Sequence, residues 1–255
     1  MFGIYDLNLC SDLPFSERLE IYKQTGFDEI ALYLDSKHNR SDENYVDIIN
    51  YARKIGLTVN QVHLDYHLSN AICDPTTNEY FDYISQKLAE ANNLNIKYVV
   101  AHASKGDNPP LLNSTQLDKF EKMMNKFDNQ PAILCLENVR NCTNLFSILR
   151  LRLKNVAVCF DVGHAHCYAD EKQLFEQCKP YVICSHIHNN FGQDTHQSPK
   201  DGEIDLAYFA KQLTEIKNCS NCLECFPPRG SNFSKEEFAS FVKLLYDETN
   251  EILSN

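Results

Sequence analysis

Histidine and acidic side chains gather in residues 185–196, which read SHIHNNFGQDTH. Three of the nine histidines in the chain and one carboxylate fall within this stretch. Imidazole and carboxylate groups together suit Zn²⁺, Mn²⁺, Co²⁺ or Fe²⁺ better than Ca²⁺, and both groups also transfer protons in catalysis. The stretch is therefore compatible with a metal site, a proton-transfer site or a polar loop, and the positions of the other histidines and acids decide among them.

Similar residues stand at the ends of short apolar runs elsewhere in the chain, as in KYVVAHAS, AILCLENV and VAVCFDVGH. Such runs are typical of buried β-strands. The residues at or just after the predicted strand ends are His63, His102, Glu137, Asp161, His164, His186, His188 and Glu224. Among the histidines only His38, near the turn after the second run, lies away from such an end. Independent scatter would not produce this distribution, so we expect one shared site.

Eight β-type runs alternate with amphipathic segments along the chain. The runs cover residues 2–9, 27–35, 57–66, 97–104, 132–139, 156–164, 181–190 and 221–227. Helix-like spacing of apolar residues is found between the runs, over residues 43–55, 79–94, 117–127 and 206–216. Gly26 and Gly56 fit the position just after a helix, and the side chains of Ser16, Asp205 and Ser234 fit helix N-caps.

This alternation predicts an α/β fold, a (β/α)8 TIM barrel that residues 1–255 form as a single domain. A doubly wound sheet is the alternative, but it needs fewer units and usually a glycine-rich phosphate loop, and neither GxGxxG nor GxxxxGK[ST] occurs. In a barrel, the carboxyl ends of all strands meet at one mouth. We therefore expect the histidines and acids of different strands to converge there.

The composition limits the choice of partners and location. The net charge of −11 argues against nucleic acid, because counterion release by basic residues supplies much of the affinity for phosphates. No apolar run approaches the roughly 20 residues that span a bilayer, so no membrane association is expected. The first residues lack the basic and apolar regions of a signal peptide, which predicts a cytoplasmic protein.

The eleven cysteines are an odd number in a large chain, and we expect them to be reduced thiols. Cys219, Cys222 and Cys225 recur at three-residue spacing. On a strand this spacing puts Cys222 on the opposite face from the other two, so we predict no metal cluster there. Thiols are also absent from most predicted strand ends, which argues against a structural zinc site at the mouth.

The ordered motifs resemble the xylose isomerase-like TIM-barrel superfamily, also called AP endonuclease family 2. The resemblance rests on CLENVRN, FDVGHAH, HIHNN with the following DTH, and the glutamate of the eighth run, and it covers nearly the whole chain. The superfamily includes sugar phosphate isomerases and epimerases, hydroxypyruvate isomerase, inosose dehydratase and endonuclease IV. It implies one divalent ion (Mn, Zn, Co or Mg) held by Glu137, Asp161, His186 and Glu224.

The resemblance also implies roles for further residues. Glu137 and Glu224 would act as catalytic acid and base, while His164 would contact substrate or, as in the nuclease branch, a metal. The additional ligands of that branch, which holds more than one zinc ion, fall on His63, His102, Asp194 and His196. His188 would orient substrate oxygens or support the site. Arg140 and Arg229 would bind a substrate carboxylate or phosphate, or form ordinary salt bridges at the rim.

The resemblance leaves two functions open. The first is a metal-dependent isomerase, epimerase or related lyase that acts on a small sugar or polyhydroxy carbonyl compound by proton transfer through a metal-stabilised enediolate. The alternative is an endonuclease IV-like multi-zinc phosphodiester hydrolase that acts on abasic DNA. The short loops LNLCSDLPFSE and LDSKHNRSDEN are mixed in charge, unlike a DNA clamp, and favour the first. Relatives often form dimers or tetramers, which suggests a homo-oligomer by analogy.

Overall fold

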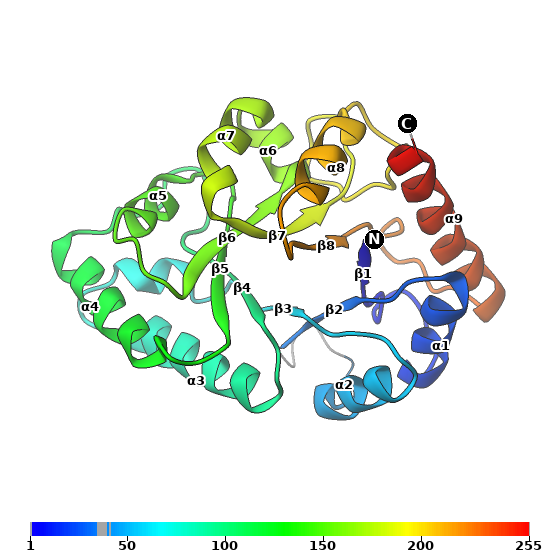
Figure 1. Ribbon diagram of the computed structural model, residues 1–255, viewed down its shortest axis with the longest axis horizontal. Helices are drawn as coiled ribbons and strands as arrows, with labels where there is room; N and C mark the ends of the chain where they lie inside the picture. The colour runs from blue at the N-terminus through cyan, green and yellow to red at the C-terminus, as the bar shows by residue number, and fades with distance from the viewer. Residues whose placement is uncertain (1, 35–39, 41, 255) are drawn as a thin grey trace.

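Eight parallel strands close into a barrel in chain order, as the sequence predicts (Figure 1). The computed structural model describes residues 2–34, 40 and 42–254, so His38 lies outside the described residues. The strands are β1 (Gly3–Tyr5), β2 (Ile30–Tyr33), β3 (Gln61–His63), β4 (Tyr98–His102), β5 (Ile133–Glu137), β6 (Val156–Asp161), β7 (Val182–Ile187) and β8 (Ser220–Leu223). Pairing of β1 with β8 closes the barrel.

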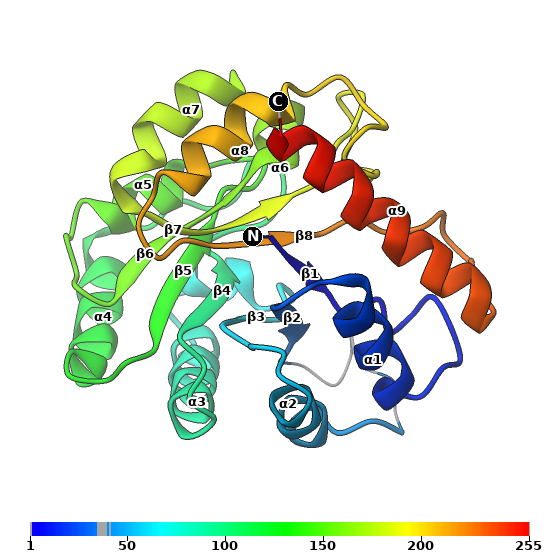
Figure 2. The ribbon, with the colours of Figure 1, turned by 45° about the vertical axis from the view of Figure 1, so that its right-hand side comes forward.

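Helices surround the strands on the outside of the barrel (Figures 1 and 2). They are α1 (Phe15–Thr25), α2 (Tyr45–Lys54), α3 (Glu79–Asn93), α4 (Ser114–Met124), α5 (Thr143–Leu149), α6 (Val162–Tyr168), α7 (Glu171–Cys178), α8 (Leu206–Thr214) and α9 (Lys235–Ser254), with 3-10 turns η1 (Ser69–Cys73), η2 (Asn125–Phe127) and η3 (Lys179–Tyr181). None of the helices in the described part of the chain has the length and apolar character needed to cross a bilayer.

The predicted element boundaries need correction at several places. The run 156–164 is not all strand, because β6 stops at Asp161 and α6 begins at Val162. The other strands are also shorter than their runs, and β8 begins one residue before its run, at Ser220. Ser16 is not an N-cap: α1 begins at Phe15 after Pro14, which fits an extended N-cap position. The α2 helix begins at Tyr45, capped by the Asn44 side chain.

Other predicted helix ends are confirmed. The side chain of Asp205 accepts a hydrogen bond from the backbone N–H of Tyr208, and that of Ser234 accepts one from Glu237. Gly26 and Gly56 have φ angles of 120° and 81° at the ends of α1 and α2, where a side chain would be strained.

Two apolar layers hold the barrel together. The larger lies between strands and helices, and the smaller fills the barrel interior with residues such as Val100, Cys135 and Cys184. Cys222 packs inside against Tyr5 and Ala31, whereas Cys225 belongs to the outer layer, so their side chains face opposite ways as predicted. All eleven cysteines lie in the described part of the chain, and none of them forms a disulfide there.

A buried arginine fixes the loop after β1, which forms part of the mouth. Arg18 of α1 donates hydrogen bonds to Asp6 at 2.9 Å and to Glu43 at 2.8 Å. It also donates to the backbone oxygen of Leu13, within the same loop. Burial alone would lower the pKa of Arg18, but the charge of Asp6 and the hydrogen bonds to Glu43 and Asp6 outweigh burial and raise it. The guanidinium therefore stays charged and holds two loops together.

Replacing Arg18 with Met should destabilise the protein by about 3–5 kcal/mol, because two carboxylates would lose their buried partner. Urea denaturation gives the free energy of unfolding. Lys23→Met is the matched control: it removes an exposed ion pair with Asp28 and should cost no more than about 1 kcal/mol. Equal losses for both variants would show that the cluster around Arg18 contributes no more than a surface pair.

Candidate metal centre

The predicted site residues converge on one cavity of about 1150 Å³ at the carboxyl ends of the strands. Its lining includes His63, His102, Glu137, Arg140, His164, Asp194, His196, Glu224 and Arg229. Asp161, His186 and His188 are fully buried next to these residues. The structure therefore brings together every candidate ligand that the sequence analysis named. These residues form three groups, each close enough to share an ion.

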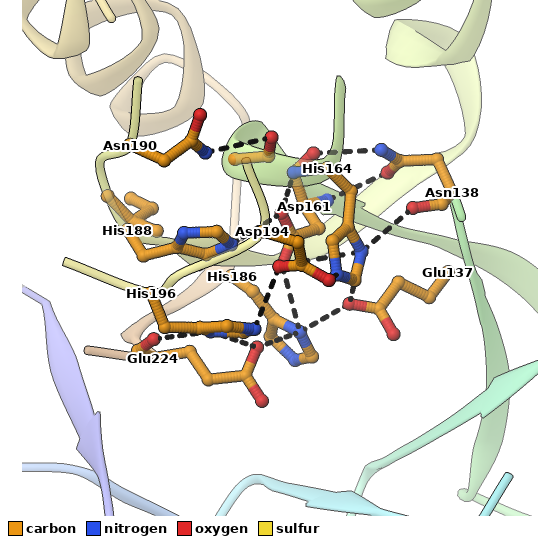
Figure 3. Close-up of polar contacts among 12 residues, drawn as sticks. Glu137, Asn138, Asp161, His164, His186, His188, Asn190, Asp194, His196 and Glu224 are labelled. Carbon is orange, nitrogen blue, oxygen red and sulfur yellow. Dashed lines mark hydrogen bonds and ion pairs between the residues drawn. The ribbon is translucent and has the colours of Figure 1, made fainter. Parts of the chain in front are cut away.

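The central group consists of Glu137, Asp161, His186 and Glu224, whose ligand atoms all lie within 4.8 Å of one another. His186 Nδ1 lies 2.7 Å from Glu137 Oε1, 3.1 Å from Glu224 Oε2 and 3.7 Å from Asp161 Oδ2. Figure 3 shows the two glutamates on either side of His186. Glu137 and Asp161 end their strands, His186 is the last residue but one of β7, and Glu224 directly follows β8, so the barrel brings them together.

Charge pairing dominates this group. Burial by itself would raise the pKa of Glu137, but the charge of His186 and hydrogen bonds from His102, His186 and His63 hold it well below its ordinary value. Burial would likewise raise the pKa of Glu224, but the charge of His186 and its hydrogen bond outweigh burial and lower it. Conversely, burial would lower the pKa of His186, and the charges of Glu224 and Glu137 raise it instead.

These residues fit a divalent cation. Glu137, Asp161 and Glu224 are all buried, and a buried carboxylate is costly unless positive charge or hydrogen bonds compensate it. Asp161 Oδ2 makes no hydrogen bond with any described residue. Three carboxylates and one imidazole are a ligand set for Mn²⁺, Zn²⁺, Co²⁺ or Mg²⁺. An ion at this point would balance the excess negative charge that a single His186 leaves.

The second group joins His63, His102 and Glu137. Glu137 Oε2 lies 3.1 Å from His63 Nε2 and 2.6 Å from His102 Nε2. The two oxygens of Glu137 therefore face different groups, Oε1 toward His186 and Oε2 toward the pair of imidazoles. Burial lowers the pKa of His102 and outweighs the opposing effect of Glu137, which favours the neutral imidazole that a metal requires.

The third group joins His164, His188, Asp194 and His196. Asp194 lies 3.4 Å from His164 Nε2 and 3.1 Å from His196 Nε2. Burial would lower the pKa of His196, but the hydrogen bond to Asp194 and the charge of Glu224 raise it to about 9. His188 Nε2 lies 3.2 Å from Asp161 Oδ1, so this group touches the central one.

The loop after β7 places Asp194 and His196. Backbone hydrogen bonds between Asn189 and Gln197 close the loop at its base. His196 itself has a φ of 50°, a left-handed conformation that residues with a side chain seldom adopt. Its carbonyl accepts a hydrogen bond from Phe226 N, and its Nδ1 lies 2.8 Å from Glu224 O. The strained residue is thus tied to the segment that carries Glu224.

Sequence reasoning missed several residues that hold the site in place. Asn138 exchanges two hydrogen bonds of 2.8 Å with the backbone of Asp161, although its motif CLENVRN was recognised. Gly163 gives room to the His188 ring, since a Cβ there would lie 2.0 Å from that ring. Tyr5 and Tyr33 are the last residues of β1 and β2, so the strand-end rule could have found them.

These tyrosines contact the central group directly. The hydroxyl of Tyr5 shares a hydrogen bond of 2.9 Å with His186 Nε2, and that of Tyr33 donates to Glu224 Oε1 at 3.1 Å. With Nε2 engaged by Tyr5, Nδ1 of His186 is the nitrogen that faces the carboxylates. Tyr5 therefore sets the ring orientation that a metal ligand needs.

Tyr5→Phe should weaken divalent-metal binding by about 10- to 100-fold, because His186 would lose the partner that orients it. Titration calorimetry with Mn²⁺ or Co²⁺ measures the effect directly. Tyr22→Phe is the control, since Tyr22 is an equally buried phenol that bonds to Asp6 rather than to the site. The assignment fails if both variants bind the metal as the unmodified protein does.

The two predicted arginines lie at the rim rather than on the floor. Arg140 is half exposed, pairs with Asp107 at 3.2 Å and lies over the Tyr168 ring at 5.1 Å. Arg229 is exposed, and it follows β8 in the segment that precedes α9. Both side chains line the cavity without contacting the three groups.

The sequence profile described as xylose isomerase-like TIM barrel matches residues 19–243, most of the chain. The chain belongs to this family. Membership explains why the ordered strand-end motifs converge on one mouth, and it confirms the resemblance found from those motifs. No curated protein sequence matches the chain.

Several solved structures share the fold of this xylose isomerase-like barrel. An L-ribulose 3-epimerase has 15% sequence identity and a TM-score of 0.77, covering 99% of this chain and 94% of its own. D-Psicose 3-epimerase from Clostridium cellulolyticum H10, solved with D-tagatose, has 14% identity and a TM-score of 0.74, with 99% of both chains covered. The probable 3-DHS dehydratase AsbF from Bacillus anthracis has 15% identity and a TM-score of 0.72, covering 96% and 98%. At these identities the likeness concerns the fold.

Proposed function

We propose that the protein is a divalent-metal-dependent isomerase or epimerase, or a related lyase, that acts on a small sugar or polyhydroxy carbonyl compound. The observation that carries this proposal is the position of Glu137 and Glu224. Both carboxylates are buried at the floor of the cavity and flank His186 from opposite sides. Two such groups can remove a proton from a carbon of the substrate and return it. The fold shared with two sugar epimerases supports the same proposal.

The residues of the site would have different roles. Glu137, Asp161, His186 and Glu224 would hold the divalent ion, which supplies Lewis-acid polarisation of the substrate carbonyl. The lowered pKa of Glu137 and of Glu224 keeps both carboxylates ionised and able to accept a proton. A hydrogen bond from the Tyr33 hydroxyl orients Glu224, and one from the imidazole of His102 orients Glu137.

A phosphodiester hydrolase is the second candidate, and one observation favours it. The four additional residues His63, His102, Asp194 and His196 do not scatter around the cavity but complete two further groups of potential ligands. Against this candidate stands the net charge of −11, which disfavours a duplex DNA substrate. The number of bound ions therefore distinguishes the two functions.

Elemental analysis of purified protein should find one exchangeable divalent ion per chain for the isomerase, whereas three zinc ions would favour the hydrolase. The His102→Ala variant sharpens the test. If the protein is an isomerase, the variant keeps its metal and changes its KM; if the protein is a hydrolase, the variant loses an ion. A cleavage assay on a duplex with one abasic site completes the comparison. Cleavage that depends on the bound zinc would refute the first proposal.

Glu224→Gln should reduce turnover by at least about 100-fold, because one proton-transfer group and one ligand are lost together. The measurement is ¹H NMR in D₂O over a panel of ketoses and aldoses, where proton transfer replaces a C–H signal beside the carbonyl with deuterium. Glu203→Gln is the control, since Glu203 pairs with His166 at the surface and is not part of the three groups. Undiminished exchange in Glu224→Gln contradicts the assigned role.

A further inference from the structure

The cavity is larger than a small sugar requires. Its volume of about 1150 Å³ exceeds the roughly 300–1,000 Å³ of pockets that enclose drug-sized ligands. The three ligand groups account for the polar floor, but the lining continues well beyond them. A monosaccharide seated on the floor would leave much of this space unused, so the rest of the lining bears on what the substrate carries.

Apolar side chains gather on one side of the cavity, where Asn8, Arg229 and Ser231 of the same segments also contribute to the lining. We call it the apolar wall and define it by its lining residues: Leu9, Phe226, Pro227, Pro228, Phe241 and Leu244. Leu9 belongs to the loop after β1, the next three residues follow β8, and the last two lie on α9. In Figure 2 these parts of the chain lie on the same side of the molecule.

The apolar wall is a built surface rather than loose loops. The backbone N–H of Phe233, just before α9, donates to the oxygen of Cys10 at 2.7 Å and joins the two segments. Asn232 donates to Asp12 at 3.0 Å beside this bond. The Phe233 and Phe241 rings pack at 5.6 Å, which fixes the start of α9 against the segment before it.

The apolar wall is also continuous with the metal centre. The Phe226 ring lies 5.1 Å from the ring of His196, a member of the third ligand group. Phe226 is followed directly by Pro227 and Pro228, which extend the surface outward. A ligand anchored on the polar floor can therefore reach the wall without leaving the cavity.

The outer end of the wall exposes large apolar side chains to solvent. Leu9 is 66% exposed and Leu244 is 45% exposed. Single exposed leucines are common, but a group of apolar side chains in a cavity beside a polar site is typical of a ligand-binding surface. Aliphatic, proline and phenylalanine side chains offer no hydrogen bonds, so this surface suits an apolar group.

We propose that the apolar wall is a second subsite, which binds an aromatic or alkyl group attached to the polyhydroxy part of the substrate. This inference rests on the proposed function, since the metal centre would hold the polar part. The substrate would then be a conjugate with one polar and one apolar end rather than a free sugar. Burial of its apolar end would add affinity in proportion to the area removed from water.

Hydroxamates of increasing chain length test the wall without knowledge of the substrate. Acetohydroxamate, hexanohydroxamate and octanohydroxamate share one metal-chelating group and differ only in their apolar tails. Calorimetry on the Mn²⁺-loaded protein should show affinity rising roughly fourfold for each methylene that the wall buries. Equal affinities for the three compounds would overturn the subsite while leaving the metal centre intact. Failure of all three to bind would overturn the metal centre and the proposed function with it.

Substitutions in the apolar wall test whether the gain in affinity with chain length arises there. Leu244→Asp and Leu9→Asp should abolish the gain with chain length while keeping the affinity for acetohydroxamate. Leu253→Asp is the control, because Leu253 lies on the same helix, is 38% exposed and does not line the cavity. An equal loss in this control would overturn the assignment. So would light scattering that shows a dimer for the unmodified protein and a monomer for Leu244→Asp, since a second copy would then cover the wall.

Discussion

Three carboxylates buried at one point are the constraint on which the site depends. Glu137, Asp161 and Glu224 come from neighbouring or distant strands and meet around His186. Such a cluster persists only where compensating charge is supplied at the same place, and a single imidazolium does not balance three carboxylates. The imidazoles, tyrosine hydroxyls and backbone groups around the cluster contribute to this compensation by forming hydrogen bonds and ion pairs with the carboxylates and with His186. Tyr5 and Tyr33, the last residues of β1 and β2, contact the cluster through their hydroxyl groups.

The three ligand groups are not independent of one another. One oxygen of Glu137 faces the central group and the other faces the second group. Asp161 contacts His186 within the central group and His188 of the third group. Positive charge in one group therefore changes the proton and metal affinity of the next. Because of this coupling, an ion bound in one group would change the affinity of the neighbouring groups for further ions.

The sequence predicted the barrel and the members of the site, because both follow from local patterns. Apolar runs mark strands, and in a closed parallel barrel every strand end points to one mouth, so Glu137, Asp161 and His186 had to meet. The contacts of Asp194 and His196 were not predictable, since they depend on the closure of a loop and on a positive φ. The helix start at Val162 was missed because Asp161 both ends a strand and caps a helix.

The cavity has a polar floor, formed by the three ligand groups, and the apolar wall beside it. The floor consists of strand ends, whose positions the barrel fixes, whereas the apolar wall comes from two connecting segments and one face of α9. Connecting segments change readily without disturbing the barrel, so members of one fold can keep a common floor and accept different substrates. Fold likeness at about 15% identity therefore concerns the barrel alone. The substrate range proposed above therefore depends on this chain's own wall, where Leu9, Phe226 and Leu244 present apolar surface to the cavity.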